Sequence, residues 1–223
     1  SMTGYRWDFG TVFQNWEILA RGLAGTFQLA VVSLGVGLVL GLLIGGARYS
    51  RNHLLHWPAT AYVEVFRNTP VLVQIMWFFF AFPIVAPFEV SAYAAATLAL
   101  SLNTSAFSAE IFRAGIQSIA RGQWDAARAL GMSYPQQLRR VILPQAVKRM
   151  LPAFTNRGLE LLKMTSLASA IAFPELLYGA RTIATAHFNP IEAYTTVALV
   201  YFAIAWPLTQ LVYAVERVLR RQE

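Results

Sequence analysis

Long apolar stretches recur along this chain and constrain its fold more than any other feature. The first runs over residues 23–46 and contains no charged residue. About 20 consecutive apolar residues are enough for a helix to cross the hydrocarbon layer of a membrane. The composition agrees, because 57% of the residues are hydrophobic and 13% are charged, whereas an average soluble domain is about 25% charged. The sequence therefore predicts an integral membrane protein.

We expect an all-α fold, with a single transmembrane domain over residues 1–223 and five membrane-spanning helices. The predicted spans are residues 23–46, 60–85, 90–111, 150–177 and 191–215. Pro70 and Pro83 interrupt the second span, so we expect a kink or a broken end there. Gly37, Gly41 and Gly45 recur every four residues in the first span, which is typical of closely packed membrane helices.

The basic residues predict the orientation of the chain. One side of the five-span arrangement carries the basic residues of segment 113–149 together with Arg48, Arg51, Arg217, Arg220 and Arg221. The opposite side carries Arg6, Arg21 and Arg181. Because basic loops face the cytoplasm, the first side is expected to be cytoplasmic, with an external N-terminus and a cytoplasmic C-terminus.

Several functions are excluded on composition and motifs. The net charge of +7 is spread between apolar spans rather than along one basic face, so nucleic-acid binding is not expected. The chain has no cysteine, and neither lysine follows a glycine, so it lacks a phosphate-binding P-loop. His53 and His56 have no third metal ligand nearby and are expected to be solvated. We expect no catalytic site, metal or cofactor in this chain.

The polar segment 113–149 predicts a compact helical hairpin outside the membrane. Residues 124–130 are strong helix formers, and Gly131 follows where a left-handed C-terminal residue belongs. Ser133 and Gln136 then form a capping box around Pro135, and the second helix is expected to break or bend at Pro144. The hairpin is either an ordinary interfacial element, with Trp124 and Tyr134 at the headgroup level, or a docking site for a cytoplasmic partner.

Motifs along most of residues 20–216 resemble the permeases of type I bacterial ABC importers. Asp125-Ala126-Ala127, Gly131 and the ending VILP at 141–144 resemble the EAA loop of that family, with Asp125 in place of the usual glutamate. The stretches at 64–74 (EVFRNTPVLVQ), 109–117 (AEIFRAGIQ) and 161–167 (LLKMTSL) resemble the polar amino acid branch. Many members of that branch carry an acidic or amide residue at the position of Met164.

The resemblance implies a five-helix permease fold in the bacterial inner membrane, whose hairpin acts as a coupling helix for a separate ATPase subunit that binds ATP and Mg²⁺. It also implies a second permease chain, identical or paralogous, an external solute-binding protein and an amino acid substrate. The coupling residues would be Asp125, Ala126, Ala127, Gly131, Leu143 and Pro144. Ala126, Ala127 and Gly131 are expected to share the face that enters the ATPase.

Two other classes of function compete with this interpretation. A membrane anchor would not explain charges within the spans, which usually mark a pathway. A gradient-driven transporter is disfavoured because five spans show no inverted repeat. Co-purification of an ATPase that stays bound would support the ABC importer alone.

Charged residues in the fourth span suggest a substrate site. Arg157, Glu160 and Lys163 recur every three residues, so they lie along one helical stripe. Arg157 could meet a substrate carboxylate and Glu160 an ammonium group, or the charges could form an ion-pair network that locks the bundle together with Glu64, Arg67 and Glu110. The further candidates for substrate binding are Thr165, Ser166, Arg67, Asn68, Thr69 and Gln74. The motif at 66–70 favours acidic or amide substrates such as glutamate, aspartate or their amides.

Overall fold

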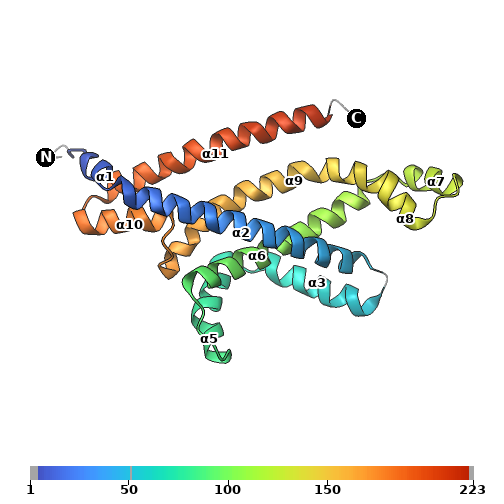
Figure 1. Ribbon diagram of the computed structural model, residues 1–223, viewed down its shortest axis with the longest axis horizontal. Coiled ribbons are helices and arrows are strands. Elements are labelled where there is room, and N and C mark those ends of the chain that lie inside the picture. The colour runs from blue at the N-terminus through green and yellow to red at the C-terminus, as the bar shows by residue number, and fades with distance from the viewer. Residues whose placement is uncertain (1–4, 51, 221–223) are drawn as a thin grey trace. The chain divides into compact units, whose positions relative to one another are not determined.

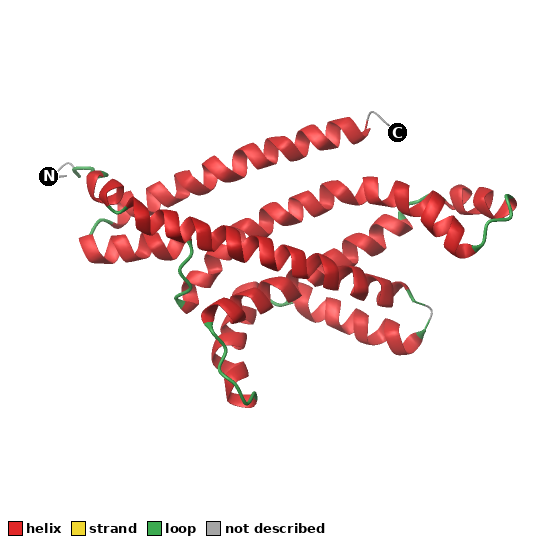
Figure 2. Ribbon diagram, viewed as in Figure 1, coloured by secondary structure: helices red, strands yellow, loops and turns green. Residues whose placement is uncertain are grey.

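The computed structural model describes residues 5–50 and 52–220. Within that part every regular element is a helix (Figure 2), so the all-α prediction is confirmed. Arg51 and Arg221, which the orientation argument uses, lie outside the described residues.

The helices follow one another with short connections (Figure 1). In chain order they are α1 (Gly10–Gln14), α2 (Trp16–Tyr49), α3 (His53–Asn68), α4 (Val71–Met76), the π-helix η1 (Trp77–Ala81), α5 (Phe82–Val85), α6 (Ala92–Gln117), α7 (Arg121–Ala129), α8 (Tyr134–Gln137), the π-helix η2 (Leu138–Ile142), α9 (Leu143–Met164), the 3-10 helix η3 (Thr165–Ile171), α10 (Leu176–His187) and α11 (Pro190–Arg220).

The helices form two compact units. Unit 1 consists of the described residues within Ser1–Ser33, Pro70–Leu100 and Leu159–Leu208. Unit 2 consists of those within Leu34–Thr69, Ser101–Gly158 and Thr209–Glu223. Each unit is described by itself below.

Two helices, α2 and α11, are long and apolar enough to cross a membrane within the described part of the chain. A third span results if α3 and the segment Val71–Val85 count as one broken helix. α6 and α9 have sufficient length, but they carry polar side chains such as Asn103 and Lys163. The count of five spans, their limits and the orientation of the termini stay predictions.

Three prolines test the expected breaks. Thr69 and Pro70 have extended backbone between α3 and α4, which confirms the break at Pro70. Pro83 and Pro144 instead lie inside continuing helix, each just after a π-helical turn. The amide of Phe82 donates to the carbonyl of Trp77, and that of Leu143 donates to Leu138. We attribute the continuity to this widened i→i−5 pattern, which relieves the clash between the proline ring and the preceding turn. The expected break at Pro144 is therefore absent, and the alternative of a bend there stays a prediction.

The predicted fourth span, residues 150–177, is not one α-helix. α9 ends at Met164 and η3 follows it as far as Ile171. Ala172 then adopts a left-handed backbone, with φ of 58°. A separate helix, α10, begins at Leu176 and ends at His187.

In unit 1, α2 packs directly against the chain just before α10. A Cβ atom on Gly25 would lie 2.4 Å from the carbonyl oxygen of Pro174, so only glycine fits there. One residue further along α2, Thr26 Oγ1 accepts a hydrogen bond of 3.1 Å from the amide of Leu176. This contact fixes the start of α10 against α2.

The first turn of α10 is capped by a buried carboxylate. Glu175 is fully buried, and its side chain accepts hydrogen bonds from the amides of Leu177 at 2.8 Å and Tyr178 at 2.7 Å. The hydroxyl of Tyr201 on α11 donates to the same carboxylate at 3.1 Å. These bonds satisfy amides that a helix N-terminus leaves without intrahelical partners.

In unit 2, the glycines of α2 pack against α6. A Cβ atom on Gly41 would lie 2.4 Å from Cβ of Ser108, and one on Gly37 would lie 2.7 Å from Cβ of Thr104. This close approach confirms that the spacing of these glycines serves helix packing. Nothing lies within 4 Å of the corresponding position on Gly35, which is also on α2.

We predict that Gly41→Ala destabilises the protein, because its methyl group would overlap the side chain of Ser108. Overpacking of this kind typically costs about 1–3 kcal/mol. Thermal unfolding of the detergent-purified chain measures the effect, with Gly35→Ala as the matched control on the same helix. Equal melting temperatures for the two variants would contradict the close packing of α2 on α6.

Candidate functional site

The hairpin has the local structure that its sequence predicts. Gly131 has a φ of 72°, in the left-handed region that favours glycine. The amide of Gly131 donates to the carbonyl of Arg128 at 2.9 Å, and that of Met132 donates to Ala127 at 3.2 Å, which ends α7. Ser133 and Gln136 form the predicted capping box at the start of α8. α7 and α8 lie next to each other in Figure 1.

The residues expected to couple to the ATPase do not all face outward. Ala126 and Gly131 are exposed, and Asp125 is exposed and forms an ion pair of 2.5 Å with Arg128. Pro144 is also exposed, and Leu143 is half-buried. Ala127 is only 2% exposed, so the expectation that it shares the outer face is wrong. At 100° per residue Ala127 points away from that face, into unit 2.

A cluster of charged side chains joins three helices of unit 2. This arginine–glutamate cluster consists of Arg48 on α2, Glu64 and Arg67 on α3, and Glu110 and Arg113 on α6. Glu110 pairs with Arg48, with Arg113 and, at 3.8 Å, with Arg67. Arg48 also lies 3.4 Å from Glu64. The hydrogen bond to Glu110 raises the pKa of the Arg113 guanidinium. Glu64, Arg67 and Glu110 of the predicted network thus belong to this cluster, while the part of the network assigned to Arg157, Glu160 and Lys163 stays a prediction.

The polar residues of the motif at 64–74 that belong to unit 2 bond locally. Asn68 Nδ2 donates to the carbonyl of Glu64 at 2.8 Å and to its carboxylate at 3.1 Å. Thr69 Oγ1 donates to the carbonyl of Val65 at 2.7 Å. Arg67 lies over the ring of Phe107, 5.4 Å from its centroid. Their role in substrate binding stays a prediction.

Arg157 is buried in unit 2, with 5% of the residue exposed. Its guanidinium donates to Oδ1 of Asn103 on α6 and lies 4.2 Å from the centroid of the Phe107 ring. Asn103 in turn donates to the carbonyl of Phe66 at 2.8 Å. These contacts connect α9, α6 and α3, which is the geometry of a packing residue.

The other predicted substrate residues belong to unit 1. Glu160 and Lys163 are exposed on α9. Thr165 is buried and donates to the carbonyl of Leu162 at 2.7 Å, and Ser166 donates to Lys163 at 2.8 Å. Gln74 is buried on α4, and α4 packs against η3. The structure thus brings the helix of Gln74 together with the helix of Thr165 and Ser166.

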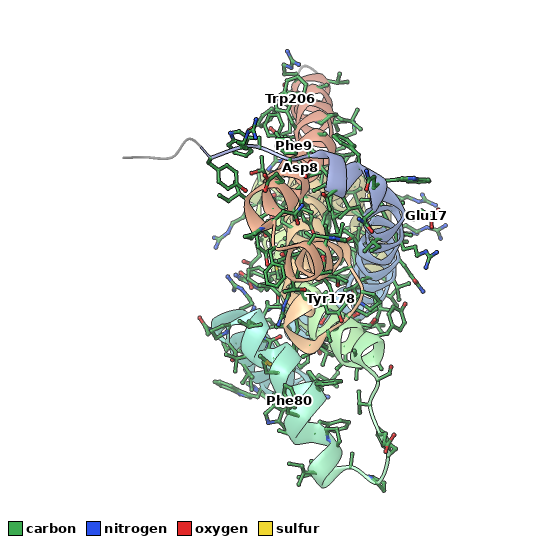
Figure 3. All side chains as sticks on the ribbon, turned by 90° about the vertical axis from the view of Figure 1, so that its left-hand side faces the viewer. Asp8, Phe9, Glu17, Phe80, Tyr178 and Trp206 are labelled. Carbon is green, nitrogen blue, oxygen red and sulfur yellow. The ribbon has the colours of Figure 1, made fainter. Side chains whose placement is uncertain are left out.

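A cavity of about 530 Å³ lies beside these elements in unit 1. η1 contributes Phe79 and Phe80 to the lining. The last residues of η3 and the residue after it contribute Ser169–Ala172. One face of α10 completes the lining with Tyr178, Arg181, Thr182 and Thr185. Figure 3 labels Phe80 and Tyr178 on the two elements that face the cavity. We call this the η1–α10 cavity.

The side chains of the η1–α10 cavity suit a small zwitterion. Among the described residues, no hydrogen bond or ion pair occupies the guanidinium of Arg181, which is exposed. Thr182 Oγ1 donates to the carbonyl of Tyr178 and Thr185 Oγ1 to that of Arg181, so both hydroxyl oxygens remain able to accept. Sequence reasoning used Arg181 only for orientation. The spacing 178, 181, 182 and 185, which is one face of a helix, is the signal that it missed.

Comparison with known proteins gives one consistent result. Residues 37–222 match the family model for a binding-protein-dependent transport system inner membrane component. The chain is 40% identical over 90% of its length to a probable amino-acid ABC transporter permease of Bacillus subtilis, YckA, covering 88% of that protein. It is 34% identical to the arginine transport system permease ArtQ of the same organism, over 97% of this chain and 99% of ArtQ.

Solved structures agree with this. A chain from the crystal structure of an amino acid ABC transporter with histidines has a TM-score of 0.91 and 33% identity, covering 96% of this chain and 99% of its own. A chain of the MetNI methionine ABC transporter has a TM-score of 0.73 over 92% of this chain and 95% of its own at 22% identity, which supports the fold alone. The chain therefore belongs to the binding-protein-dependent inner membrane components, as a type I ABC importer permease of the amino-acid group rather than an enzyme, an anchor or a gradient-driven transporter.

Proposed function

We propose that this permease moves polar amino acids into the cytoplasm and that the η1–α10 cavity receives the substrate on its way. ATP is hydrolysed by a separate subunit, and an external binding protein delivers the substrate. The observation that carries the proposal is a cavity of about 530 Å³ that combines an unoccupied guanidinium, hydroxyl groups and aromatic rings.

The chemistry of the cavity fits the parts that all α-amino acids share. The guanidinium of Arg181 can bind a carboxylate through two parallel hydrogen bonds. The hydroxyl oxygens of Thr182 and Thr185 can accept from the ammonium group, and the rings of Phe79 and Phe80 can attract it through their π faces. The volume lies within the range of about 300–1,000 Å³ that is usual for small-molecule sites. Arg181 also falls on the side predicted to be external, where a binding protein would dock.

This chemistry does not select among amino acid side chains. The relatives include permeases named for arginine, L-cystine and glutamine transport. The preference for glutamate, aspartate or their amides therefore stays an expectation from the motif at 66–70. An uptake panel of labelled amino acids, run with the complete transporter, identifies the substrate.

The hairpin is proposed to dock into the ATPase subunit through the outward face of α7. Ala126 and Ala129 are exposed on that face, and Leu130 beside them is 79% exposed. Small side chains flanking one large apolar side chain suit insertion into a cleft. Gly131 ends the helix and sets the direction in which the face points.

A second permease chain is proposed to complete the pathway. The segment of α4, η1 and α5 exposes large apolar side chains, among them Trp77, Phe80, Ile84 and Val85. Phe80 also lines the η1–α10 cavity, so a chain that covers this segment would close one side of it. An identical and a paralogous partner are both compatible with this surface.

Arg181→Gln is predicted to lower uptake because the substrate carboxylate loses a charged, bidentate partner. A hydrogen bond to a charged group contributes about 1.5–3 kcal/mol, which is a loss of about 10- to 150-fold. Uptake is measured in proteoliposomes that contain the complete transporter, at a saturating concentration of loaded binding protein. Arg181→Lys should restore part of the activity, and Arg21→Gln, on an exposed arginine of α2, is the control. Unchanged uptake by Arg181→Gln would exclude this cavity from the pathway.

A second pair of variants tests whether Arg157 and Glu160 bind the substrate. If Arg157 packs rather than binds, Arg157→Gln should lower the melting temperature, because it removes the contacts with Asn103 and Phe107. Glu160 is exposed, so Glu160→Gln should lower the melting temperature less than Arg157→Gln does. If the two residues bind substrate instead, both variants will lose uptake with normal assembly and normal basal ATPase activity.

Gly131→Val is predicted to release or uncouple the ATPase while the chain still inserts into the membrane. A left-handed backbone costs an ordinary residue about 1–2 kcal/mol, and β-branched side chains tolerate it worst. Gly131→Asn is the matched control, because asparagine adopts this conformation readily. Co-purification of the ATPase and its transport-coupled activity give the answer. Full retention of both by Gly131→Val would leave the hairpin as a plain interfacial element.

A further inference from the structure

Two cavities in unit 2 are lined in part by residues of the hairpin, and the substrate proposal uses neither of them. One has a volume of about 860 Å³ and is lined by Tyr49, Arg121, Trp124, Asp125, Arg128, Tyr134 and Gln137. The other has a volume of about 700 Å³ and is lined by Gly46, Tyr49, Ser50 and Tyr134. Because they share Tyr49 and Tyr134, we treat them as one site, the hairpin cavity.

The hairpin cavity lies where α2 leaves the apolar layer. α2 is a membrane-spanning helix by length and composition, and Gly46, Tyr49 and Ser50 are at its end. Trp124 and Tyr134 both line the larger cavity and stack on each other, with ring centroids 5.9 Å apart and planes 19° apart. Tryptophan and tyrosine gather at the headgroup level of membranes. The walls of the cavity therefore belong to the membrane surface rather than to the aqueous side alone.

The charge of the cavity favours an anion. Arg121 is exposed, and no hydrogen bond or ion pair within the described chain occupies its guanidinium. Arg128 is paired with Asp125, so the charges of Arg121, Asp125 and Arg128 sum to one net positive charge in the lining. A guanidinium binds phosphate oxygens in a planar, bidentate geometry. Tyr49 and Ser50 add hydroxyl groups at the same level.

The cavity and Ala126, which is proposed to face the ATPase, lie on different sides of α7, although Asp125, a coupling residue by family resemblance, also lines the cavity. Arg121, Trp124, Asp125 and Arg128 follow the spacing i, i+3, i+4 and i+7, which is one face of the helix. At 100° per residue Ala126 points away from that face, whereas Ala129 lies one turn after Asp125, at its edge. A ligand that lies against Arg121 therefore leaves Ala126 accessible to the ATPase.

We propose that the hairpin cavity binds the headgroup of an anionic phospholipid. The phosphate lies against Arg121, the aromatic pair borders the glycerol region, and the acyl chains run along the end of α2. The bound lipid holds the hairpin at a fixed depth beside the membrane. A free phosphate compound shares the charge chemistry but has no use for the aromatic wall or for α2.

The test uses the complete transporter in detergent micelles doped with phosphatidylglycerol or phosphatidylcholine, with native mass spectrometry to count retained lipids. A basic residue near an anionic surface contributes about 1 kcal/mol, so Arg121→Gln should weaken retention of phosphatidylglycerol about fivefold. Arg139→Gln is the matched control, because Arg139 is exposed on η2 and lines neither cavity. Phosphatidylcholine should be retained weakly and equally by all variants.

Three outcomes would overturn the proposal. Equal retention of phosphatidylglycerol by wild type and Arg121→Gln would show that the cavity holds no headgroup. Equal losses for Arg121→Gln and Arg139→Gln would reduce the effect to net charge. Displacement of the bound lipid by millimolar inorganic phosphate would assign the site to a soluble anion.

Discussion

The close approach of α2 to its neighbours is the contact on which both units depend. Lipid tails are as apolar as leucine, so helices in a membrane gain little by burying apolar surface and depend on tight packing instead. In unit 1 the missing side chain of Gly25 admits the backbone of Pro174, and the bond from Leu176 to Thr26 becomes possible. In unit 2 the missing side chain of Gly41 admits α6 at Ser108. The start of α10, and with it one wall of the η1–α10 cavity, follows from the first contact.

Polar groups inside the units obey a second constraint. A buried charge is tolerated only when neighbouring groups replace water. Glu175 is held by two helix-terminal amides and a tyrosine hydroxyl, and Arg157 by an amide oxygen and an aromatic ring. Both side chains are used to join helices. Arg181 differs, because it is exposed beside a cavity and no group of the described chain occupies its guanidinium. This contrast is why we propose Arg181 as the substrate ligand rather than Arg157.

Irregular helices build the wall of that cavity. η1 is a π-helix and η3 is a 3-10 helix, and both turn side chains away from regular α-helical positions. Non-regular backbone within a membrane protein is tolerated where it is buried in protein or lines a cavity. The π-helical turns also allow Pro83 and Pro144 to stay inside helices. The same kind of π-helical turn thus occurs beside the η1–α10 cavity in unit 1 and in the hairpin of unit 2.

The all-α class, the membrane environment, the hairpin with its left-handed Gly131 and the family follow from the amino-acid pattern alone. These features rest on short-range patterns: apolar length, capping residues and glycine where the backbone turns. The motif at 64–74 also contains Glu64 and Arg67, which belong to the arginine–glutamate cluster. Sequence could not decide whether Arg157 packs or binds, because spacing along α9 does not reveal the Asn103 and Phe107 that meet it.

Only the tertiary structure placed Ala127 on the buried side of α7, divided residues 150–177 into α9, η3 and α10, and joined η1 to α10 around Arg181. The physical reason is the same in each case. Burial and cavity walls depend on which distant segments meet, and those meetings are set by close contacts such as Gly25 with Pro174. A helical period predicts which residues share a face, and the packing of the neighbouring helices decides what that face meets.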